Sequence, residues 1–223
     1  RLKALYGEAL GHPCVVGLVI GTRPDCVDEE KLDYLQALGR GEVLDGWKRD
    51  GFDKPLVKIE YGIESTRDET LARISRGHDF ACARKAVEMT AERGIPTGAH
   101  FILALPGETR GMMLEQCSVI NSLPLTSVKF HQLQIVRGTR MEKEYSACPQ
   151  DFESFTLPEY LDFIVDILER LRPDLLIERV AGEVPPRFVE RTPWGLVRNF
   201  EILRMLDSRL SERNTFQGAL LPC

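Results

Sequence analysis

The 223-residue chain lacks the features that would place it in a membrane, in the secretory pathway or on a broad nucleic-acid surface. No apolar run approaches the ~20 residues that span a bilayer, and no signal peptide or lipidation motif is visible. The net charge of −5 and the pI near 5.5 argue against a wide nucleic-acid footprint, although they leave room for a local basic groove. We therefore expect a cytoplasmic protein whose partner is a small molecule.

The cysteines are scattered, with no CxxC and no cluster of three. They are Cys14, Cys26, Cys82, Cys117, Cys148 and Cys223. This spacing is neither the disulfide framework of a small secreted domain nor a zinc signature. We expect reduced, mostly buried thiols and no intact metal site within this chain.

The chain also lacks an initiating methionine. It begins with Arg1, within a helix that the spacing of Leu2, Leu5 and Leu10 predicts. We interpret the sequence as a fragment whose N-terminal part is missing, and processing or the trimming of disordered ends is the alternative. Its length and its hydrophobic content of 43% suffice for one sizeable core.

What the sequence does contain is a repeated pattern, in which an apolar strand-like run ends in a small polar or glycine-bearing motif before a helical segment. The runs cover residues 15–20, 56–59, 100–103 and 127–133. In parallel α/β folds ligands bind where strands end, so we expect these four endings to face one site.

Helical periodicity fills the segments between the runs. The predicted helices cover residues 27–39, 68–75, 79–93, 109–123, 157–171 and 194–210, with one more strand at 175–180. Residues 41–55 are expected to form an exposed loop or partial helix, and the tail after Ser211 is expected to fray. The alternation predicts right-handed parallel βαβ units. It fits most of a barrel whose first strands are missing, which would leave a long exposed sheet edge.

The first ending carries Gly21, Thr22 and Arg23, followed by Pro24 and Asp25. It is either a ligand wall or a plain strand-to-helix turn. As a ligand wall, it would let a ligand approach the glycine backbone while Thr22 and Arg23 donate hydrogen bonds. As a turn, it would use Pro24 to end the strand and Asp25 to cap the next helix.

The second ending runs from Glu60 to Ser65 and places Glu60, Gly62 and Glu64 on one face of a strand. Two acids buried together raise a pKa unless a cation or polar ligand accompanies them. Arg76, twelve residues after Glu64, returns from the following helix as a candidate for that cation. A carboxylate and a guanidinium at a strand end can hold a zwitterion or a ribose diol, and the alternative is a surface salt-bridge network.

Histidines and a tight turn mark the remaining endings. A lone histidine such as His100, at the start of its run, is more often structural. Leu105 and Pro106 lead into a helix whose N-terminus can accept an anionic or polar group, although any helix start would look similar. His131 alternates with Lys129, so both are expected to point into the barrel. His78, in a polar turn between two helices, is either a cap or a site residue.

Taken in order, these motifs resemble the radical S-adenosylmethionine (radical SAM) enzymes. They look closest to the uncharacterised YhcC-like group, related to the Elongator catalytic subunit and the oxygen-independent coproporphyrinogen oxidases. The resemblance rests on the order and spacing of residues 20–25, 60–65, 73–78, 100–109, 129–133, 137–139 and the helix that begins at Pro193-Trp194. It covers nearly the whole chain.

The resemblance implies a partial (β/α)6 TIM-like barrel of the radical SAM type. In that family a CxxxCxxC loop after the first strand holds a 4Fe–4S cluster, whose open iron chelates S-adenosylmethionine before reductive cleavage to a 5′-deoxyadenosyl radical. We expect residues 1–145 to form the core with strands three to six, and residues 146–223 to form an extension packed on it. The chain has no CxxxCxxC. Alone it should bind no cluster and perform no radical chemistry, whereas its full-length parent should.

The resemblance also implies a set of cofactor-binding residues. Glu64 stands where relatives often carry a glutamine that contacts the cofactor, and Arg76 stands where an arginine binds its carboxylate. Gly21 replaces a glutamate of the Elongator-like pattern, His100 replaces an aspartate of the coproporphyrinogen oxidases, and Ala104 replaces a common glycine. The expected set is Gly21, Thr22, Arg23, Glu60, Gly62, Glu64, Ser65, Arg76, His100, Leu105, Pro106 and His131, with no catalytic residue assigned.

Two other functions fit the same residues. One is a complete α/β barrel enzyme that uses Glu60 or Glu64 with His131 for acid–base chemistry. The other is a cluster-less binding or adaptor domain. The substrate stays open, since relatives act on tRNA, porphyrins or small metabolites, and the acidic balance of this chain disfavours tRNA.

Overall fold

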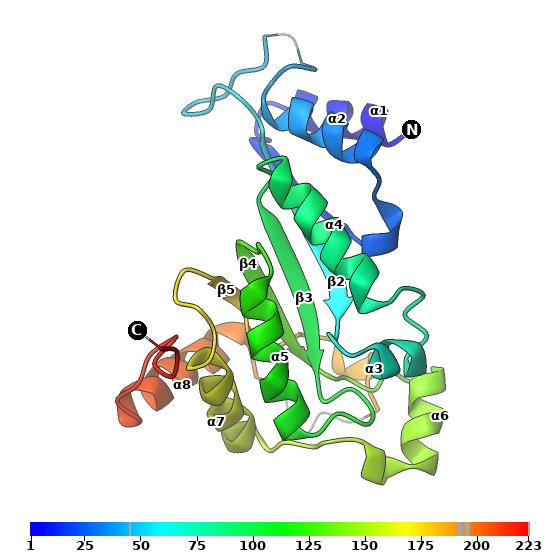
Figure 1. Cartoon of the computed structure of the whole chain (residues 1–223), viewed down its shortest axis with the longest axis vertical. Helices are drawn as coiled ribbons and strands as arrows, with labels where there is room; N and C mark the ends of the chain where they lie inside the picture. The colour runs from blue at the N-terminus through cyan, green and yellow to red at the C-terminus, as the bar shows by residue number, and fades with distance from the viewer. Residues whose placement is uncertain (45, 191–193, 195–196, 223) are drawn as a thin grey trace.

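A parallel sheet forms the centre of the fold. The computed structural model describes residues 1–44, 46–190, 194 and 197–222. Its strands lie side by side in chain order (Figure 1): β1 (Gly17–Thr22), β2 (Leu56–Glu64), β3 (Thr97–Leu103), β4 (Ser127–Gln132) and β5 (Leu176–Arg179). Each neighbouring pair is parallel. The predicted parallel α/β organisation is therefore confirmed, since each crossover advances the sheet by one strand in the same direction.

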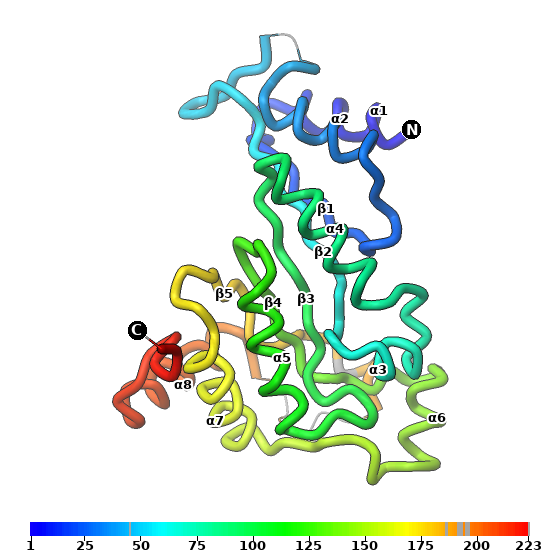
Figure 2. Tube along the Cα trace, in the orientation of Figure 1, coloured from blue at the N-terminus to red at the C-terminus, as the bar shows by residue number. Residues whose placement is uncertain are grey.

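Helices fill the connections between the strands. They are α1 (Leu2–Gly11), α2 (Glu29–Gly39), α3 (Asp68–Arg73), α4 (Phe80–Glu92), α5 (Arg110–Ser122), α6 (Arg140–Ala147), α7 (Leu157–Leu168) and α8 (Asn199–Glu212), with short 3₁₀ turns η1 (Pro24–Cys26), η2 (Pro149–Asp151) and η3 (Pro186–Phe188). Figures 1 and 2 show the strands running from the end that holds α1 and α2 towards the end that holds α3 and α6. No helix among the described residues is long and apolar enough to cross a membrane.

The two faces of the sheet differ because side chains alternate along each strand. On β2, Ile59 and Tyr61 are fully buried, and the Tyr61 hydroxyl lies 2.7 Å from the Thr90 hydroxyl of α4. Phe101 of β3 and Phe130 of β4 are buried on the same face. In Figure 1, α4 and α5 lie in front of the strands and cover this apolar face.

The opposite face carries charged and imidazole side chains, and we call it the polar face. It is formed by Lys58, Glu60, Gly62, Glu64, His100, Lys129, His131, Glu178 and Arg179, as the strand register and the contacts described below indicate. Helices α4 and α5 cover the sheet on its other side. The apolar half of each strand supplies the core, so the polar half is free to build a site.

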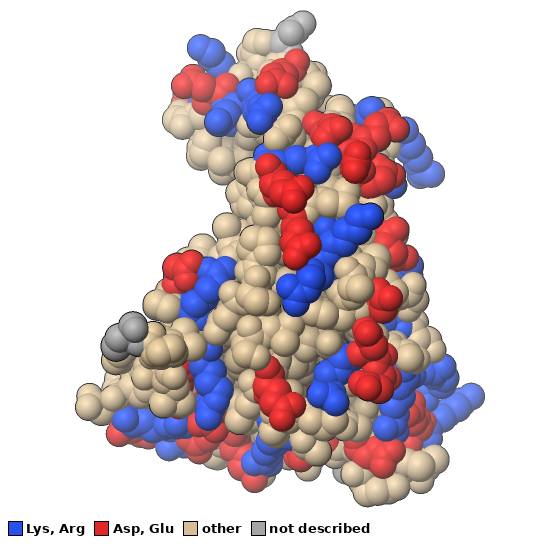
Figure 3. Space-filling model, in the orientation of Figure 1, with Lys and Arg blue, Asp and Glu red and all other residues tan. Residues whose placement is uncertain are grey.

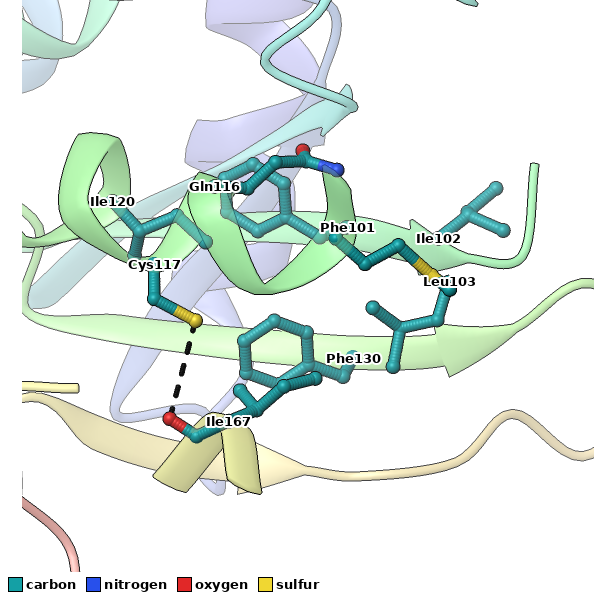
Figure 4. A pocket seen from close by; sticks show the side chains of 9 residues that line it. Phe101, Ile102, Leu103, Gln116, Cys117, Ile120, Phe130 and Ile167 are labelled. Carbon is teal, nitrogen blue, oxygen red and sulfur yellow. Dashed lines mark hydrogen bonds between the residues drawn. The ribbon is translucent and has the colours of Figure 1, made fainter. Parts of the chain in front are cut away.

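A small apolar cavity lies within the helical layer (Figure 4). Cys117 and Ile120 of α5, Phe130 of β4 and Ile167 of α7 are among its lining residues. The Cys117 thiol points at the Ile167 carbonyl oxygen, 4.0 Å away, and burial raises its pKa to about 12. This thiol is therefore part of the core. The expectation that most cysteines are buried was wrong, because Cys117 is the one buried cysteine among the described residues.

Two expectations at the C-terminal end and one strand boundary were wrong, and one helix was not predicted. The last helix begins at Asn199, not at residue 194, and part of the intervening segment lies outside the described residues. The tail is packed, because Gln217 Nε2 donates to the carbonyl oxygens of Arg172 and Leu175 at 2.8 Å. Helix α6 was not predicted, and none of its residues is buried. Strand β3 begins at Thr97, which places His100 in its middle.

Candidate functional site

At the carboxyl end of β2, Arg76 and Glu64 meet above Gly62. The Arg76 guanidinium donates to the Gly62 carbonyl oxygen, through Nε at 3.2 Å and also through Nη2. Arg76 Nη2 lies 3.2 Å from Glu64 Oε1, and both side chains are about one fifth exposed, at 20% and 17%. A Cβ at Gly62 would lie 2.5 Å from Arg76 Nη2 and 2.8 Å from Glu64 Oε1, so a side chain there would displace the charged ends of both residues.

Local backbone conformation brings these side chains together. The register between β2 and β3 shifts between Gly62 and Glu64, and Glu64 has a φ of 73°, which turns the chain out of the strand. After α3, Ser75 (φ 55°) and Gly77 (φ 86°) reverse the chain on either side of Arg76. The guanidinium is thus returned to the strand end from which the chain left, as the sequence predicts.

Burial dominates the electrostatics of Glu64. It raises the pKa of the Glu64 carboxyl above its usual value, against the opposing effects of Arg76, His100 and His78. The carboxyl group can therefore take up a proton more easily than an exposed glutamate. A ligand that donates hydrogen bonds to Glu64 would instead hold it as the anion.

The end of β1 lies beside the same turn. Arg23 Nη2 approaches within 3.6 Å of the position that a Cβ of Gly77 would occupy, and Arg23 Nε donates to Asp25 Oδ1 at 2.9 Å. Gly21 has open space where a side chain would be. Thr22 is paired in register with Tyr61, which faces α4, so its side chain lies on the helical side of the sheet.

Deeper on the polar face, four charged side chains form a ring across β2, β4 and β5. Lys129 Nζ lies 2.7 Å and 2.6 Å from the two carboxylate oxygens of Glu60, and 3.4 Å from Glu178 Oε2. Lys58 Nζ is 3.0 Å from Glu60 Oε1 and also contacts Glu178. His100 Nε2 completes the surroundings of Glu60 at 3.0 Å from Oε2.

Glu60 is held firmly as an anion. Burial would raise the pKa of its carboxyl, but hydrogen bonds from Lys129, His100 and Lys58 outweigh it and lower the pKa to about 2. Its side chain is only 8% exposed. Glu60 is therefore a weak base and a good structural counter-charge, in contrast with Glu64 at the strand end.

His131 occupies the next position along β4 on the polar face. Its ring stacks on that of His100 with the centroids 5.5 Å apart. Nε2 is buried and has no hydrogen-bond partner among the described residues. Burial lowers the pKa of His131 to about 4, with help from His100, Arg179 and Lys129, so the ring is neutral near pH 7.

Three residues of the expected set are buried in the turns that follow β2 and β3. They are Ser65, Leu105 and Pro106. Ser65 is fully buried, and its hydroxyl donates to Glu108 Oε1 at 2.5 Å. Glu108 also accepts from Gln116 Nε2 at 3.1 Å, so this group ties the turn after β2 to the start of α5. Leu105 and Pro106 are buried in the turn after β3. Their side chains pack in the interior and leave the polar face to other residues.

The structure therefore gathers eight of the twelve expected residues into two clusters and leaves Thr22, Ser65, Leu105 and Pro106 outside them. Gly62, Glu64 and Arg76 meet at the strand ends, next to Gly21 and Arg23, while Glu60, His100 and His131 belong to the deeper cluster. Lys58, Lys129, Glu178 and Arg179 were not in the expected set. The period-two alternation of β2 and β4 marks Lys58 and Lys129 as neighbours of Glu60 and His131, but no local signal marks the two residues of β5.

The described cysteines do not assemble into a cluster site. Cys14 and Cys26 are exposed, Cys82 and Cys148 are partly buried, and Cys117 is in the core. Among the described residues no group of three or more His, Cys, Asp or Glu side chains could hold a metal ion. A 4Fe–4S cluster needs several convergent thiolates, so these residues do not fit one.

Comparison with known proteins identifies the family. A family model described as the radical SAM superfamily matches residues 6–116, and one described as the radical SAM C-terminal domain matches residues 125–212. This chain belongs to the radical SAM superfamily. The family uses S-adenosylmethionine and a 4Fe–4S cluster, and the parallel α/β fold described above agrees with membership.

Individual relatives extend over nearly the whole chain. The uncharacterized protein MJ0486 of Methanocaldococcus jannaschii is 32% identical over 219 residues, which cover 98% of this chain and 64% of that protein. YhcC of Escherichia coli is 31% identical over 226 residues, covering 99% of this chain and 66% of YhcC. The expected similarity to the YhcC-like group is confirmed. The chain thus spans about two thirds of the length of these relatives.

A solved structure supports the same fold. The archaeal Elp3 of Methanocaldococcus infernus, with an N-terminal deletion, superposes with a TM-score of 0.72 at 18% identity. The match covers 97% of this chain and 47% of that one. At this identity the likeness concerns the fold alone.

Proposed function

We propose that this chain supplies the S-adenosylmethionine-binding part of a radical SAM enzyme. The observation that carries the proposal is the Arg76–Glu64 pair above Gly62, at the carboxyl end of β2. Ligands of parallel α/β folds bind at such strand ends. The pair also offers both charges that a zwitterionic amino acid group requires, in a partly buried position where they are strong.

Each side chain has a distinct role in this proposal. Arg76, already oriented by the Gly62 carbonyl oxygen, binds the carboxylate of the methionine part. Glu64 accepts hydrogen bonds from the ammonium group or the ribose hydroxyls. Gly21 and Arg23, at the end of the neighbouring strand, form the adjacent wall, where the open space beside Gly21 leaves room for the ligand.

The radical chemistry is assigned to the full-length parent. S-adenosylmethionine, when bound to a reduced 4Fe–4S cluster, supplies a 5′-deoxyadenosyl radical that abstracts hydrogen from a substrate. The described residues do not fit such a cluster, so in this proposal its cysteines come from polypeptide outside them. The role of this chain is to bind and orient the cofactor. By itself it is expected to be inactive.

The acid–base alternative is less well supported. Glu60 has a pKa of about 2 and accepts hydrogen bonds from Lys58, Lys129 and His100, so it is a poor proton acceptor near neutral pH. Mixed charges on the face seen in Figure 3 show no extended basic patch among the residues described there. The net charge of −5 disfavours a nucleic acid relative to a small-molecule ligand.

Calorimetric titration of the purified chain with S-adenosylmethionine tests the proposal. Wild type should bind, and Arg76→Gln should weaken binding about tenfold or more, because a hydrogen bond to a charged group contributes about 1.5–3 kcal/mol. Arg84→Gln is the matched control, since Arg84 lies on α4 in an exposed pair with Glu88. Arg76→Lys, which keeps the charge, should bind with intermediate affinity.

Absence of binding by wild type, or equal binding by Arg76→Gln, would refute the cofactor site. For the parent protein, reconstitution with iron and sulfide followed by detection of 5′-deoxyadenosine tests the activity. A reconstituted parent that never cleaves the cofactor would favour the adaptor alternative.

A further inference from the structure

Nearly every charged group of the polar face has a partner on that face. Glu60 is surrounded by Lys58, Lys129 and His100, and Glu178 contacts both lysines. At the strand end Arg76 pairs with Glu64. Two polar side chains of the face stand apart from this network, and they come from neighbouring strands.

The first is Arg179 of β5. The strand register pairs Arg179 with Lys129, and the register shift between β4 and β5 leaves Glu178 to face the two lysines. Arg179 is exposed, and its guanidinium makes no hydrogen bond or ion pair with any residue that the structure describes. It is therefore the uncompensated cation of this face.

The second is His131 of β4. Neither of its ring nitrogens has a hydrogen-bond partner within the described part of the chain, and Nε2 is buried. Native proteins satisfy the great majority of their buried polar atoms, so such an atom calls for an explanation. The strand register pairs Arg179 with Lys129, and His131 lies two residues further along β4, so the two side chains belong to neighbouring positions of the polar face.

The segment after β5 fixes the position of His131. Gly182 N donates to Gln132 Oε1 at 2.8 Å, and Gln132 Nε2 donates back to the Gly182 carbonyl oxygen at 3.0 Å. A Cβ at Gly182 would lie 2.8 Å from His131 Nδ1, so only glycine permits this approach. His131 and Arg179 are thus held on a preformed wall, as ligand sites require.

We propose that Arg179 and His131 form an oxyanion-binding site on the polar face, which takes the carboxylate or phosphate group of a small molecule. A planar guanidinium matches either group, and an imidazole beside it donates a further hydrogen bond. The ion ring forms the floor of the site. Its two lysines, Lys58 and Lys129, balance the charges of its two glutamates, Glu60 and Glu178. This site is separate from the Arg76–Glu64 pair, so the inference does not rest on the proposed cofactor role.

Binding of an oxyanion has a measurable consequence at His131. The ring is surrounded by cations and by apolar burial, which keep it neutral. A bound carboxylate or phosphate reverses the local charge and favours the imidazolium, which donates from both nitrogens. The ligand should therefore raise the pKa of His131 from about 4 by about one pH unit or more, with uptake of a proton.

Side-chain nitrogen NMR of the histidines, in the ¹⁵N-labelled chain, tests the proposal. The His131 titration is recorded with inorganic phosphate, with acetate and with chloride at matched ionic strength, and His131→Gln assigns its signal. The expected result is a raised His131 pKa with phosphate, with acetate or with both. The more effective probe tells whether the natural group is a phosphate or a carboxylate.

Arg179→Gln should abolish this shift, and Arg179→Lys should keep part of it. Arg204→Gln, at an exposed arginine of α8, is the matched control and should respond like wild type. A His131 pKa that neither anion moves, or a response that survives in Arg179→Gln, would overturn the site. If only S-adenosylmethionine moves it, the group belongs to the cofactor pocket and the inference is wrong. An unchanged affinity of Arg179→Gln for S-adenosylmethionine keeps the two proposals distinguishable.

Discussion

Lys129 of β4 reaches across β3 to place its ammonium group 2.6 Å from Glu60 Oε2 of β2. The strand between them carries Gly98, which is paired with Glu60 in the strand register. A Cβ at Gly98 would lie 3.0 Å from Ser127 Oγ, 3.1 Å from Glu60 Cγ and 3.2 Å from Lys58 Cε. A side chain at position 98 would therefore press on Glu60 and Lys58, two members of the ion ring.

Substitution of Gly98 by alanine should destabilise the protein. The added methyl group must displace Glu60, Lys58 or Ser127, and overpacking of this kind costs about 1–3 kcal/mol. Urea unfolding of wild type and Gly98→Ala measures the difference. Gly7→Ala is the control, because a Cβ there meets nothing within 4 Å on helix α1 and should stabilise by about 0.5–1 kcal/mol. Equal stability of Gly98→Ala and wild type would show that a side chain at this position fits beside Glu60, Lys58 and Ser127 without strain.

The Glu60 carboxylate should contribute to stability in a pH-dependent way. Its pKa is lowered from 4.5 to about 2 in the folded protein. Its contribution is therefore complete above pH 4.5 and is lost as the pH falls towards 2. Glu60→Gln should be less stable than wild type at neutral pH, with the gap narrowing over that range.

Unfolding midpoints measured across this pH range check the Glu60 prediction. Asp53→Asn serves as the control, because the Asp53 side chain is 94% exposed and its surface pair should contribute little. A gap between Glu60→Gln and wild type that stays constant down to pH 2 would show that the carboxylate is not held by the ring.

His131 predicts a linkage of the same sign at higher pH, although here burial disfavours the charged form. The pKa is lowered from 6.5 to about 4 in the folded state, so as the pH falls from 6.5 to 4 the unfolded chain takes up a proton that the folded chain does not. Wild type should lose stability across this interval, and His131→Gln should lose less. Parallel stability curves for the two proteins, measured by chemical unfolding, would contradict the buried neutral ring.

Substitution of Ser65 should destabilise the protein through the buried hydrogen-bond network around Glu108. The Ser65 hydroxyl donates to Glu108, whose pKa is raised by burial despite hydrogen bonds from Ser65, Thr70 and Gln116. Ser65→Ala removes a donor from a buried carboxyl group and should cost about 1–3 kcal/mol. Ser118→Ala, at an exposed hydroxyl of α5, should change the free energy of unfolding by less than about 0.5 kcal/mol. Comparable losses in the two variants would argue against the network.

Much of the site at the end of β2 was predictable from local spacing. The alternation of Glu60, Gly62 and Glu64 placed them on one face, and the return of Arg76 followed from the short helix between them. The supporting role of Ser65 was not predictable, because Glu108 and Gln116 reach it from another segment. Helix α6 escaped prediction because it is short and polar and buries no residue.

By itself the sequence determined the parallel α/β organisation, the family and the residues that alternate along each strand. These follow from periodicity and from the order of motifs, which are local properties of the chain. Only the tertiary structure decided which of the polar residues have an ion-pair or hydrogen-bond partner. Glu60 pairs with Lys58 of its own strand and with Lys129 of β4, and Glu178 of β5 pairs with both lysines. Arg179 and His131 find no hydrogen-bond or ion-pair partner among the described residues. Whether two charged side chains pair depends on the distance between them across the sheet, and the strand register sets that distance.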